Sequence, residues 1–540
     1  MDQATRNLQI GLESQPVTER RNRRSLILAG ILLVAAGYIL LLVASALTRK
    51  PINDEGMFAI PAWTLATKGY LGSPVLDEAG WRFQNVNRYT YYMFPLYPTM
   101  LAFWYKLVGF GLFQLRAVSI LSGLALGFAL FSLLRRLGIE KAPAIAAVVL
   151  CLLDYHMLVG ASFGRYDVLV AALGFGGYAA YLALRERSLS LALLLSNTLI
   201  AAAGMMHPNG LMFFIALWAL LIIPRDWRRV FKPKQIAAAA APYLFGAILW
   251  GAYIAQSPES FKTQLGGNSY SRVGILRPLA ALQAELEQRY LPAFGFPQAH
   301  SAGHSGPIRL KVIPLVFYMI GLLGCLLIPA LRNAKPVRQL LWLLLAHFAY
   351  LSLFEGIKFP YYLVQIIPLY ASVLACFLYW CWESMRQPAA RLVLAGSVAL
   401  LLLVQVGGVL LRVRLDTYGK GYRPAAEYLI ANAKPDEVIN ASCEMGFALG
   451  FRRNLIDDLR LGYFNGYKAT YVVVDDVMEG TIEAWRNGSD LDRKIAAFIT
   501  NKLANQYQPV YRHEYFTIYK LRPEAGPATR PEEWATAHRS

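Results

Sequence analysis

The chain has 540 residues, of which 56% are hydrophobic and only 16% are charged, and its formal net charge is +19. This composition excludes an ordinary soluble domain, in which about 25% of residues are charged. It predicts a membrane protein with many spans. Because the basic residues collect in short clusters between apolar segments, we interpret the positive charge as a determinant of topology and expect no nucleic-acid partner.

A window of roughly twenty residues, the length that crosses the hydrocarbon core, predicts about eleven transmembrane helices. The first of them follows a basic tail, residues 1–25, and is too long for the apolar core of a secretory signal. The expected spans are Leu26–Thr48, Leu112–Leu137, Ala142–Val159, Tyr166–Leu184, Leu189–Met206, Gly210–Ile223, Ile236–Ala255, Lys311–Leu331, Val337–Leu353, Tyr361–Trp382 and Arg391–Leu411.

The basic clusters predict the orientation of the chain. With a cytoplasmic N-terminus, the loops that carry these clusters all face the cytoplasm, as the positive-inside rule requires. They contain Arg135, Arg136 and Lys141, then Arg185 and Arg187, then Arg225 to Lys234, then Arg332 to Arg338, and finally Arg386. We therefore expect a multi-pass protein of the plasma (inner) membrane, with residues 49–111, 256–309 and 412–540 on the outer side.

The outer segments contain shorter predicted elements. Met57–Thr67 and Phe94–Val108 are apolar and aromatic enough to lie as helices in the membrane interface. Leu276–Tyr290 has leucines at helical spacing. We expect residues 26–411 to form an all-α polytopic domain with interfacial helices in its outer loops.

Beyond residue 411 the long apolar segments end, and short β-type segments alternate with helical ones. Ser489 and Asp492 form a capping-box pattern before a further helix, Ile495–Leu503. A small extracytoplasmic α/β domain with a loose C-terminus is therefore expected over residues 412–540. Its other expected elements are the strands Val438–Ser442, Ala469–Asp475 and Tyr515–Leu521 and the helix Pro424–Ala433.

Asp54 and Glu55 are adjacent carboxylates a few residues beyond the first expected span. A carboxylate at the outer lip of the bilayer is partly desolvated and can act as a base. A structural interpretation is also open, in which Asn53 caps the following helix and the two carboxylates complement its dipole. The two interpretations are compatible, because a helix start is a rigid place to mount a base.

Other polar residues fall at the outer ends of expected spans. Arg165 and Asp167 begin the fourth span, where a charged group is a functional candidate and a guanidinium suits a phosphate. A structural ion pair between them is the alternative. His207, at an outer turn, is either a hydrogen-bonding loop residue or a ligand of the substrate. Lys358, before the tenth span, either extends to lipid headgroups or holds a lipid phosphate.

The aromatic residues Tyr92, Tyr97 and Tyr361 either belong to an interfacial belt or contact the substrate together with Asp167, by stacking on a sugar or guiding an isoprenoid chain. His300 and His304 are four residues apart, but the glycines around them argue against a helix and hence against a metal site. No cofactor is expected, and no ligand set in the sequence indicates a divalent metal.

Six segments of the chain have a recognisable pattern: Asn53–Ala59, Phe94–Pro98, Leu115–Ser119, Gly164–Asp167, His207–Gly210 and Lys358–Pro368. In these segments the chain resembles bacterial GT-C glycosyltransferases, a group that includes lipid A aminoarabinose transferases and protein O-mannosyltransferases. The lysine and double proline of the aminoarabinose transferases are absent from Tyr92–Pro95, and the loop 256–309 is too short for the β-trefoil insertion of the eukaryotic mannosyltransferases.

The resemblance implies a GT-C fold and a hexosyl- or pentosyltransferase that uses a polyprenyl-phosphate sugar donor. It would glycosylate a lipid, glycan or protein acceptor on the outer side, with inversion. Asp54 would be the general base and Glu55 its support, while Arg165, Lys358 and His207 would bind the donor phosphate.

Two other functions stay open from the residues alone. One is a transporter or flippase of a lipid-linked sugar, and the other is an O-antigen polymerase or ligase. The lack of internal repeats argues against the first. Carboxylates near the start of the chain argue against the second.

Overall fold

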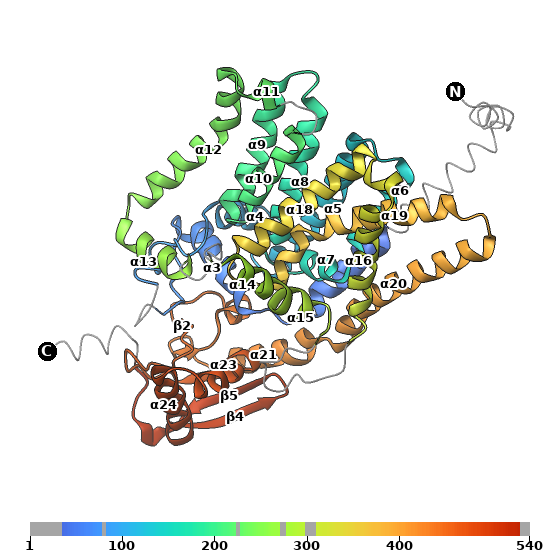
Figure 1. Ribbon diagram of the computed structural model, residues 1–540. Helices are drawn as coiled ribbons and strands as arrows, with labels where there is room; N and C mark the ends of the chain where they lie inside the picture. The colour runs from blue at the N-terminus through green and yellow to red at the C-terminus, as the bar shows by residue number, and fades with distance from the viewer. Residues whose placement is uncertain (1–34, 78–82, 223–226, 270–276, 297–308, 530–540) are drawn as a thin grey trace, which may run out of the picture.

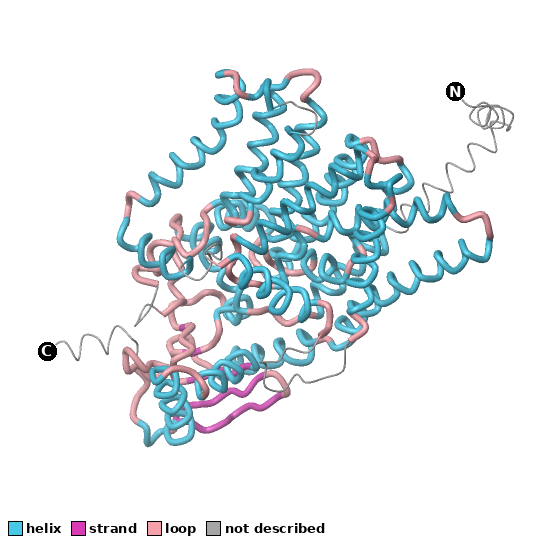
Figure 2. The backbone as a smooth tube through the Cα atoms, in the orientation of Figure 1, coloured by secondary structure: helices cyan, strands magenta, loops and turns pink. Residues whose placement is uncertain are grey.

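The computed structural model describes residues 35–77, 83–222, 227–269, 277–296 and 309–529. A body of helices carries a small sheet at one end (Figure 1), and the strands gather in that region (Figure 2). The body begins with a helix at Ala35–Thr48. It continues with α3 (Asn53–Lys68), α4 (Leu96–Val108), α5 (Leu112–Leu137), α6 (Lys141–Leu152), α7 (Tyr155–Ala161), α8 (Asp167–Leu184), α9 (Leu189–Met206), α10 (Gly210–Ile222), α11 (Trp227–Val230), α12 (Pro233–Ile254), α13 (Pro258–Ser269), α14 (Pro278–Ala284), the π-helix η1 (Glu285–Tyr290), α15 (Leu291–Ala293), α16 (Val312–Leu327), α17 (Pro329–Arg332), α18 (Lys335–Leu353), the 3₁₀ helix η2 (Pro360–Gln365), α19 (Ile367–Ser384) and α20 (Pro388–Leu415).

Five helices of the described chain are long and apolar enough to cross a membrane: α5, α8, α9, α12 and the helix that begins with α20. Two bent pairs raise the number to seven if each pair is one span. They are Ala35–Thr48 with α3, bent by 91°, and α6 with α7, bent by 65°. The expected count of about eleven is therefore not confirmed, partly because α10 and α16 have only 13 and 16 residues, fewer than the roughly twenty that a span needs.

Two of the long helices expose apolar side chains to the surroundings. α12 buries none of its residues, and Leu244, Phe245, Ile248 and Leu249 are each more than half exposed. α20 likewise exposes Leu403 and several other aliphatic residues. Continuous apolar surface of this kind is not stable in water. Lipid must cover these helices, and the chain is a membrane protein.

The C-terminal region contains a five-stranded sheet in the order β2-β1-β3-β5-β4. β1 pairs parallel with β2 and β3, whereas β5 pairs antiparallel with β3 and β4. The elements of the region are the π-helix η3 (Tyr418–Tyr422), α21 (Arg423–Asn432), β1 (Ile439–Asn440), the 3₁₀ helix η4 (Cys443–Met445), α22 (Gly446–Leu449), β2 (Leu455–Ile456), β3 (Tyr471–Asp475), α23 (Asp476–Arg486), α24 (Asp490–Gln506), β4 (Tyr507–His513), β5 (Phe516–Leu521) and the 3₁₀ turn η5 (Pro523–Ala525).

The central strand β3 is buried on both faces. Val472 and Val474 belong to a core cluster with residues of α23 and α24, while Tyr471 and Val473 belong to the large cluster that continues into the helical body. Alternate residues of a strand point to opposite faces, so the sheet links two cores. This packing attaches the C-terminal region firmly to the membrane domain.

The predicted α/β character of the tail is confirmed. β1, β3, β5 and α21 lie within one or two residues of their expected bounds. Ser489 caps α24, and its hydroxyl accepts a hydrogen bond from the backbone N–H of Asp492. The strands β2 and β4 and the helix α23 were not predicted. β2 has only two residues, and no local pattern marks so short a strand.

Gly210 lies where the start of α10 touches α9. A Cβ atom at this position would lie 2.2 Å from the backbone nitrogen of Gly204 and 2.4 Å from its Cα. Backbone atoms cannot move aside as a flexible side chain can. The turn between these two helices therefore requires glycine at position 210.

We expect Gly210→Ala to destabilise the protein by about 1–3 kcal/mol, the usual cost of overpacking. Gly204→Ala is the matched control, since a Cβ there would meet nothing within 4 Å. Thermal unfolding of both variants in the same detergent measures the difference. Equal midpoints would contradict the close approach of the two helices.

Candidate functional site

The start of α3 joins the membrane domain to the C-terminal sheet. Ile52 is the N-cap, and Asn53 is the first helical residue, so the expectation that Asn53 caps the helix is wrong. The side-chain nitrogen Nδ2 of Asn53 instead donates to Ser442 Oγ and Asp457 Oδ2, both at 3.1 Å. Its neighbours in the sequence suggest that the Asn53 side chain caps the helix, but residues distant in the chain bind it instead.

Glu55 is fully buried and forms an ion pair with Arg116 of α5. Arg116 Nε and Nη2 donate to the two carboxylate oxygens, each at 2.7 Å. Glu55 Oε1 also accepts the backbone N–H of Gly164 at 2.8 Å, and Oε2 that of Ile52 at 3.3 Å. Both carboxylate oxygens are thus occupied. The geometry assigns Glu55 to the framework that holds the start of α3 against α5.

Arg116 has further partners on the bend that precedes α3. Its Nη1 donates to the carbonyl oxygens of Ala46 at 2.6 Å and Arg49 at 2.8 Å, and its Nη2 donates to that of Lys50 at 3.3 Å. A guanidinium can satisfy this many acceptors because it has five N–H donors in one plane. Arg116 therefore fixes the bend and the helix start together.

Asp54, the neighbour of Glu55, has a different environment. Its side chain is 39% exposed, and Oδ2 accepts a hydrogen bond from Arg165 Nη1. Arg165 also donates from Nε to Asp167 Oδ2 at 2.7 Å, so the ion pair that the structural interpretation predicted is present. Arg165 and Asp167 are buried, and Asp167 Oδ1 has no hydrogen-bond partner in the described part of the chain. Of the three charged groups, Asp54 alone is substantially exposed.

Aromatic rings surround Asp54, Arg165 and Asp167, which we call the charged group. The Arg165 guanidinium lies 4.5 Å from the centroid of the Tyr361 ring. Tyr166 contacts Tyr97 on one side, with ring centroids 5.4 Å apart, and stacks on His207 on the other at 5.0 Å. The structure therefore brings Asp54, Arg165 and the rings of Tyr97, Tyr361 and His207 into one contiguous set.

His207 and Tyr92 have specific polar partners. His207 Nδ1 accepts the backbone N–H of Asn209 at 3.2 Å, and Nε2 shares a hydrogen bond of 3.3 Å with the Tyr362 hydroxyl. Tyr92 lies apart from the charged group, and its hydroxyl donates to the carbonyl oxygen of Met57 at 2.8 Å. Tyr92 thus holds α3 against the first outer loop.

Lys358 is buried and turned into the protein. Its ammonium donates to the carbonyl oxygens of Leu351 and Ser352 at 2.9 and 2.8 Å and also to that of Glu355. Glu285 Oε2 of η1 lies 3.2 Å from the same nitrogen, and Glu285 Oε1 pairs with Arg289. Four oxygens surround three N–H donors, and Lys358 therefore has no donor left over for a phosphate in this conformation.

Three cations that we did not predict lie near one another, beyond the Tyr361 ring as seen from Arg165, and we call Arg49, Lys311 and Arg412 the cationic cluster. The Arg49 guanidinium lies 4.2 Å from the ring of Phe163, which stacks on Tyr361. Lys311 and Arg412 approach the Tyr155 ring within 4.2 and 5.4 Å.

The cationic cluster is electrostatically unfavourable as it stands. Burial lowers the pKa of Arg49, and repulsion from Arg412 lowers it further. Arg49 Nη1 is buried without a hydrogen-bond partner among the described residues. One sequence signal could have identified the cluster, since all three residues stand at the outer ends of expected spans, where the positive-inside rule disfavours basic residues.

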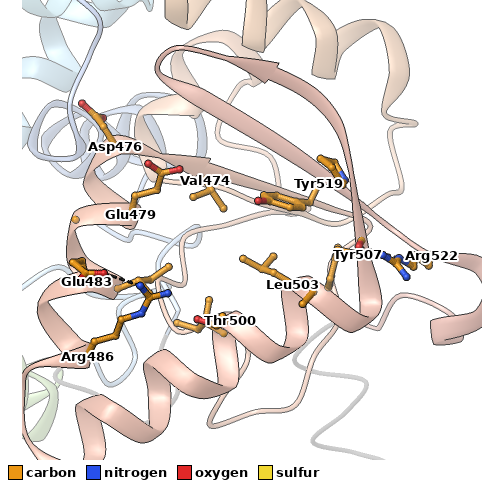
Figure 3. Close-up of a pocket in the computed structure, with 15 residues that line it drawn as sticks. Val474, Asp476, Glu479, Glu483, Arg486, Thr500, Leu503, Tyr507, Tyr519 and Arg522 are labelled. Carbon is orange, nitrogen blue, oxygen red and sulfur yellow. Dashed lines mark hydrogen bonds and ion pairs between the residues drawn. The ribbon is translucent and has the colours of Figure 1, made fainter.

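The C-terminal domain also contains a pocket of about 730 Å³ between α23, α24 and the sheet. Figure 3 shows Tyr507 and Tyr519 on the sheet side and Glu479, Glu483 and Arg486 along α23. None of the predicted site residues lines this pocket.

In the residues that the structure describes, no group of three or more His, Cys, Asp or Glu side chains could hold a metal ion, and His300 and His304 lie outside those residues.

Known structures of low sequence identity share this fold. ArnT from Cupriavidus metallidurans in the apo state is 16% identical, with a TM-score of 0.59 over 93% of this chain and 99% of that chain. Two structures of the Archaeoglobus fulgidus oligosaccharyltransferase are each 13% identical. The apo form has a TM-score of 0.53 over 85% of this chain and 72% of that chain. The complex of that enzyme, AglB, with an inhibitory peptide and a dolichol-phosphate has a TM-score of 0.51 over 91% and 74%.

The chain therefore has the fold of ArnT and of this oligosaccharyltransferase, as the resemblance implied. No family model and no curated protein matches the sequence. At these identities the likeness establishes the architecture. The chemistry has to be argued from the residues of this chain.

We expect Arg116→Met to destabilise the protein by about 3–5 kcal/mol, because Glu55 would be left as a buried, unpaired charge. The double variant Glu55→Gln/Arg116→Met should be more stable than Arg116→Met alone, since it removes that charge. Chemical denaturation in detergent measures both. Arg486→Met, which breaks an exposed pair with Glu483, is the control and should change stability little. Additive effects of the two substitutions would contradict the pairing.

Proposed function

We propose that the chain is an integral-membrane glycosyltransferase that moves a sugar from a polyprenyl-phosphate carrier to an acceptor on the outer side of the membrane. The observation that carries the proposal is the setting of Asp54. It is an exposed carboxylate mounted on a helix start that the buried Glu55–Arg116 pair fixes. Arg49 of the cationic cluster is linked to Arg165, the partner of Asp54, through the Phe163 and Tyr361 rings. A base beside an anion site suits transfer from a lipid phosphate.

In the proposed reaction Asp54 accepts the proton of an acceptor hydroxyl. The hydroxyl oxygen attacks the anomeric carbon, the bond from that carbon to the phosphate oxygen breaks, and polyprenyl phosphate leaves with the electron pair. Attack opposite to the leaving group inverts the anomeric centre. Arg165 orients Asp54 through their hydrogen bond, and Asp167 binds the other side of the guanidinium.

We assign the leaving phosphate to the cationic cluster. Arg165 is already shared between two carboxylates, and the ammonium of Lys358 is surrounded by oxygens. Arg49 has an unpaired buried N–H group, and an anion near Arg412 would relieve the repulsion between the two arginines. Tyr361 is partly exposed beside Arg165 and contacts the sugar or the first isoprene units in this proposal, whereas His207 and Tyr97 are buried and support it through Tyr166.

The outer side of the membrane fits this chemistry. Nucleotide sugars are absent outside the cytoplasm, so an activated sugar has to arrive on a lipid carrier. The orientation expected from the basic loops, with a cytoplasmic N-terminus and an extracytoplasmic C-terminal domain, puts Asp54 on that side. The AglB structure was solved with a dolichol-phosphate, which is a lipid carrier of this class. The acceptor is a lipid, glycan or protein hydroxyl.

Asp54→Asn should lower the transfer rate by ~10²–10⁴, the range for loss of a general base, without loss of folded protein. The measurement is single-turnover transfer from radiolabelled polyprenyl-phosphate sugar in proteoliposomes. Asp490→Asn, at an exposed ion pair of α24, is the control. Turnover near that of the wild type in Asp54→Asn would exclude Asp54 as the base. Movement of labelled lipid across the bilayer without transfer by the wild type would favour a flippase.

Arg412→Gln should raise the KM for the lipid-linked donor by ~10-fold or more, the effect of losing a hydrogen bond to a charged group, and kcat should change less. Arg414→Gln is a matched control, because residue 414 lies on the same turn of α20 but about 200° around the helix. Initial rates at varied donor concentration measure both constants. An unchanged KM in Arg412→Gln would leave the phosphate to Arg165, Lys358 and His207.

A further inference from the structure

A single carboxylate of the C-terminal sheet domain reaches the first turn of α3. Asp457 follows β2, and its Oδ2 accepts hydrogen bonds from the Asn53 side chain at 3.1 Å and from the backbone N–H of Cys443 at 2.9 Å. The Cys443 thiol in turn donates to the carbonyl oxygen of Asn53 at 3.3 Å. Asp457 and η4 together form a closed set of bonds around Asn53, the residue directly before Asp54.

Close packing makes this junction rigid. A Cβ atom on Gly56 would lie 2.6 Å from both Cys443 Sγ and the backbone nitrogen of Glu444, so the backbones of α3 and η4 touch. Figure 1 shows β2 on the side of the C-terminal domain that faces the helical body. The backbone of Asp457 is also tied to the first outer loop, where its N–H donates to Val75 O at 2.8 Å and its carbonyl accepts from Asp77 N at 3.2 Å.

We propose that Asp457 is a positioning residue for the base Asp54: its ionised carboxylate holds Asn53, and through Asn53 it sets where Asp54 stands. The inference rests on the proposed transferase function. It gives the C-terminal domain a part in the reaction that does not depend on contact with either substrate. Protonation of Asp457 weakens its hydrogen bonds to Asn53 and Cys443, because a neutral acceptor binds N–H groups less strongly than a carboxylate.

Asp457 has a pKa well above that of an ordinary aspartate. Burial raises its pKa to about 6, the Cys443 donors oppose the shift, and the nearby carboxylates Asp458 and Asp475 add to it. Above about pH 6 the group is a carboxylate and holds Asn53. Below that pH it is protonated and the hold weakens. The other titratable or charged groups around the junction are Asp54, Asp77, Tyr92, Cys443, Glu444, Arg460, Tyr467 and, beside Asp475, Lys50.

The first test is the pH profile of kcat for the full-length protein in proteoliposomes. The wild type should lose activity as pH falls through about 6. Asp457→Asn keeps the shape of the side chain but not its charge, so we expect kcat at pH 7.5 to fall by ~10-fold with little change in KM. The fall in activity near pH 6 should disappear from its profile. A purely structural residue would lower the yield of folded enzyme and leave the profile unchanged.

A double-mutant cycle asks whether Asp457 acts through Asn53. Asn53→Ala should reproduce the effect of Asp457→Asn, and combining them should add nothing further. Asp457→Glu should restore part of the pH dependence. Additive losses, or a change confined to KM, would overturn the positioning role. Asp490→Asn is the control for loss of a carboxylate from the same domain.

A second measurement is independent of transfer activity. Hydrogen exchange of the purified wild type should be faster for amides of residues 50–60 at pH 5 than at pH 7.5, after correction for the intrinsic rate. Asp457→Asn should show the faster exchange at both pH values, while residues 490–500 stay unchanged. Unaltered exchange at residues 50–60 would overturn the inference. The exchange result together with an inactive wild type would refute the transferase function and leave the coupling intact.

Discussion

The buried ion pair of Glu55 and Arg116 joins segments that are far apart in the chain. Arg116 stands on α5, Glu55 on α3, and the same guanidinium holds the carbonyl groups of the bend after the first helix. Burying two charges costs several kcal/mol for each ion, and the cost is offset only when their hydrogen-bonding groups are well paired. Here the carboxylate oxygens receive donors from Arg116, Gly164 and Ile52. Because so many hydrogen bonds hold the pair, its position is fixed, and it fixes the position of the start of α3.

Two adjacent carboxylates therefore have separate tasks because their environments differ. Glu55 is enclosed and bonded on both oxygens, whereas Asp54 is exposed and contacts a guanidinium that Asp167 already shares. In a helix, neighbouring residues point about 100° apart. One turn can then direct one acidic group into the protein and leave the other at the surface. The order of the pair in the sequence decides which of them meets solvent.

The sequence predicted those elements whose formation depends on residues close together in the chain. The apolar stretches of α5, α8 and α9, the tail strands β3 and β5, and the cap of α24 at Ser489 all follow hydrophobic periodicity or capping chemistry. The bend of 91° before α3 was not predicted, because it depends on Arg116 binding three distant carbonyl groups. Asn53 illustrates the same limit. Its local preference is to cap a helix, but a carboxylate 404 positions away engages it.

The same reasoning explains the phosphate candidates. Arg165 and Lys358 were visible as charged residues at membrane depth, but sequence does not reveal that buried oxygens already surround them. The cationic cluster gathers from three separate helix ends, and its members become neighbours only in the fold. No spacing within the chain encodes that proximity.

In the proposed reaction, the charge of the cationic cluster affects both the breaking of the donor bond and the release of the carrier. A sugar phosphodiester carries one negative charge, and the polyprenyl monophosphate that leaves it can carry two. Cations that repel each other when empty bind the leaving group more strongly than the donor, and so favour bond breaking as charge develops. The same attraction retains the spent carrier. The spent carrier then has to leave sideways into the bilayer, and α20, the helix that carries Arg412, exposes its apolar side chains to that bilayer.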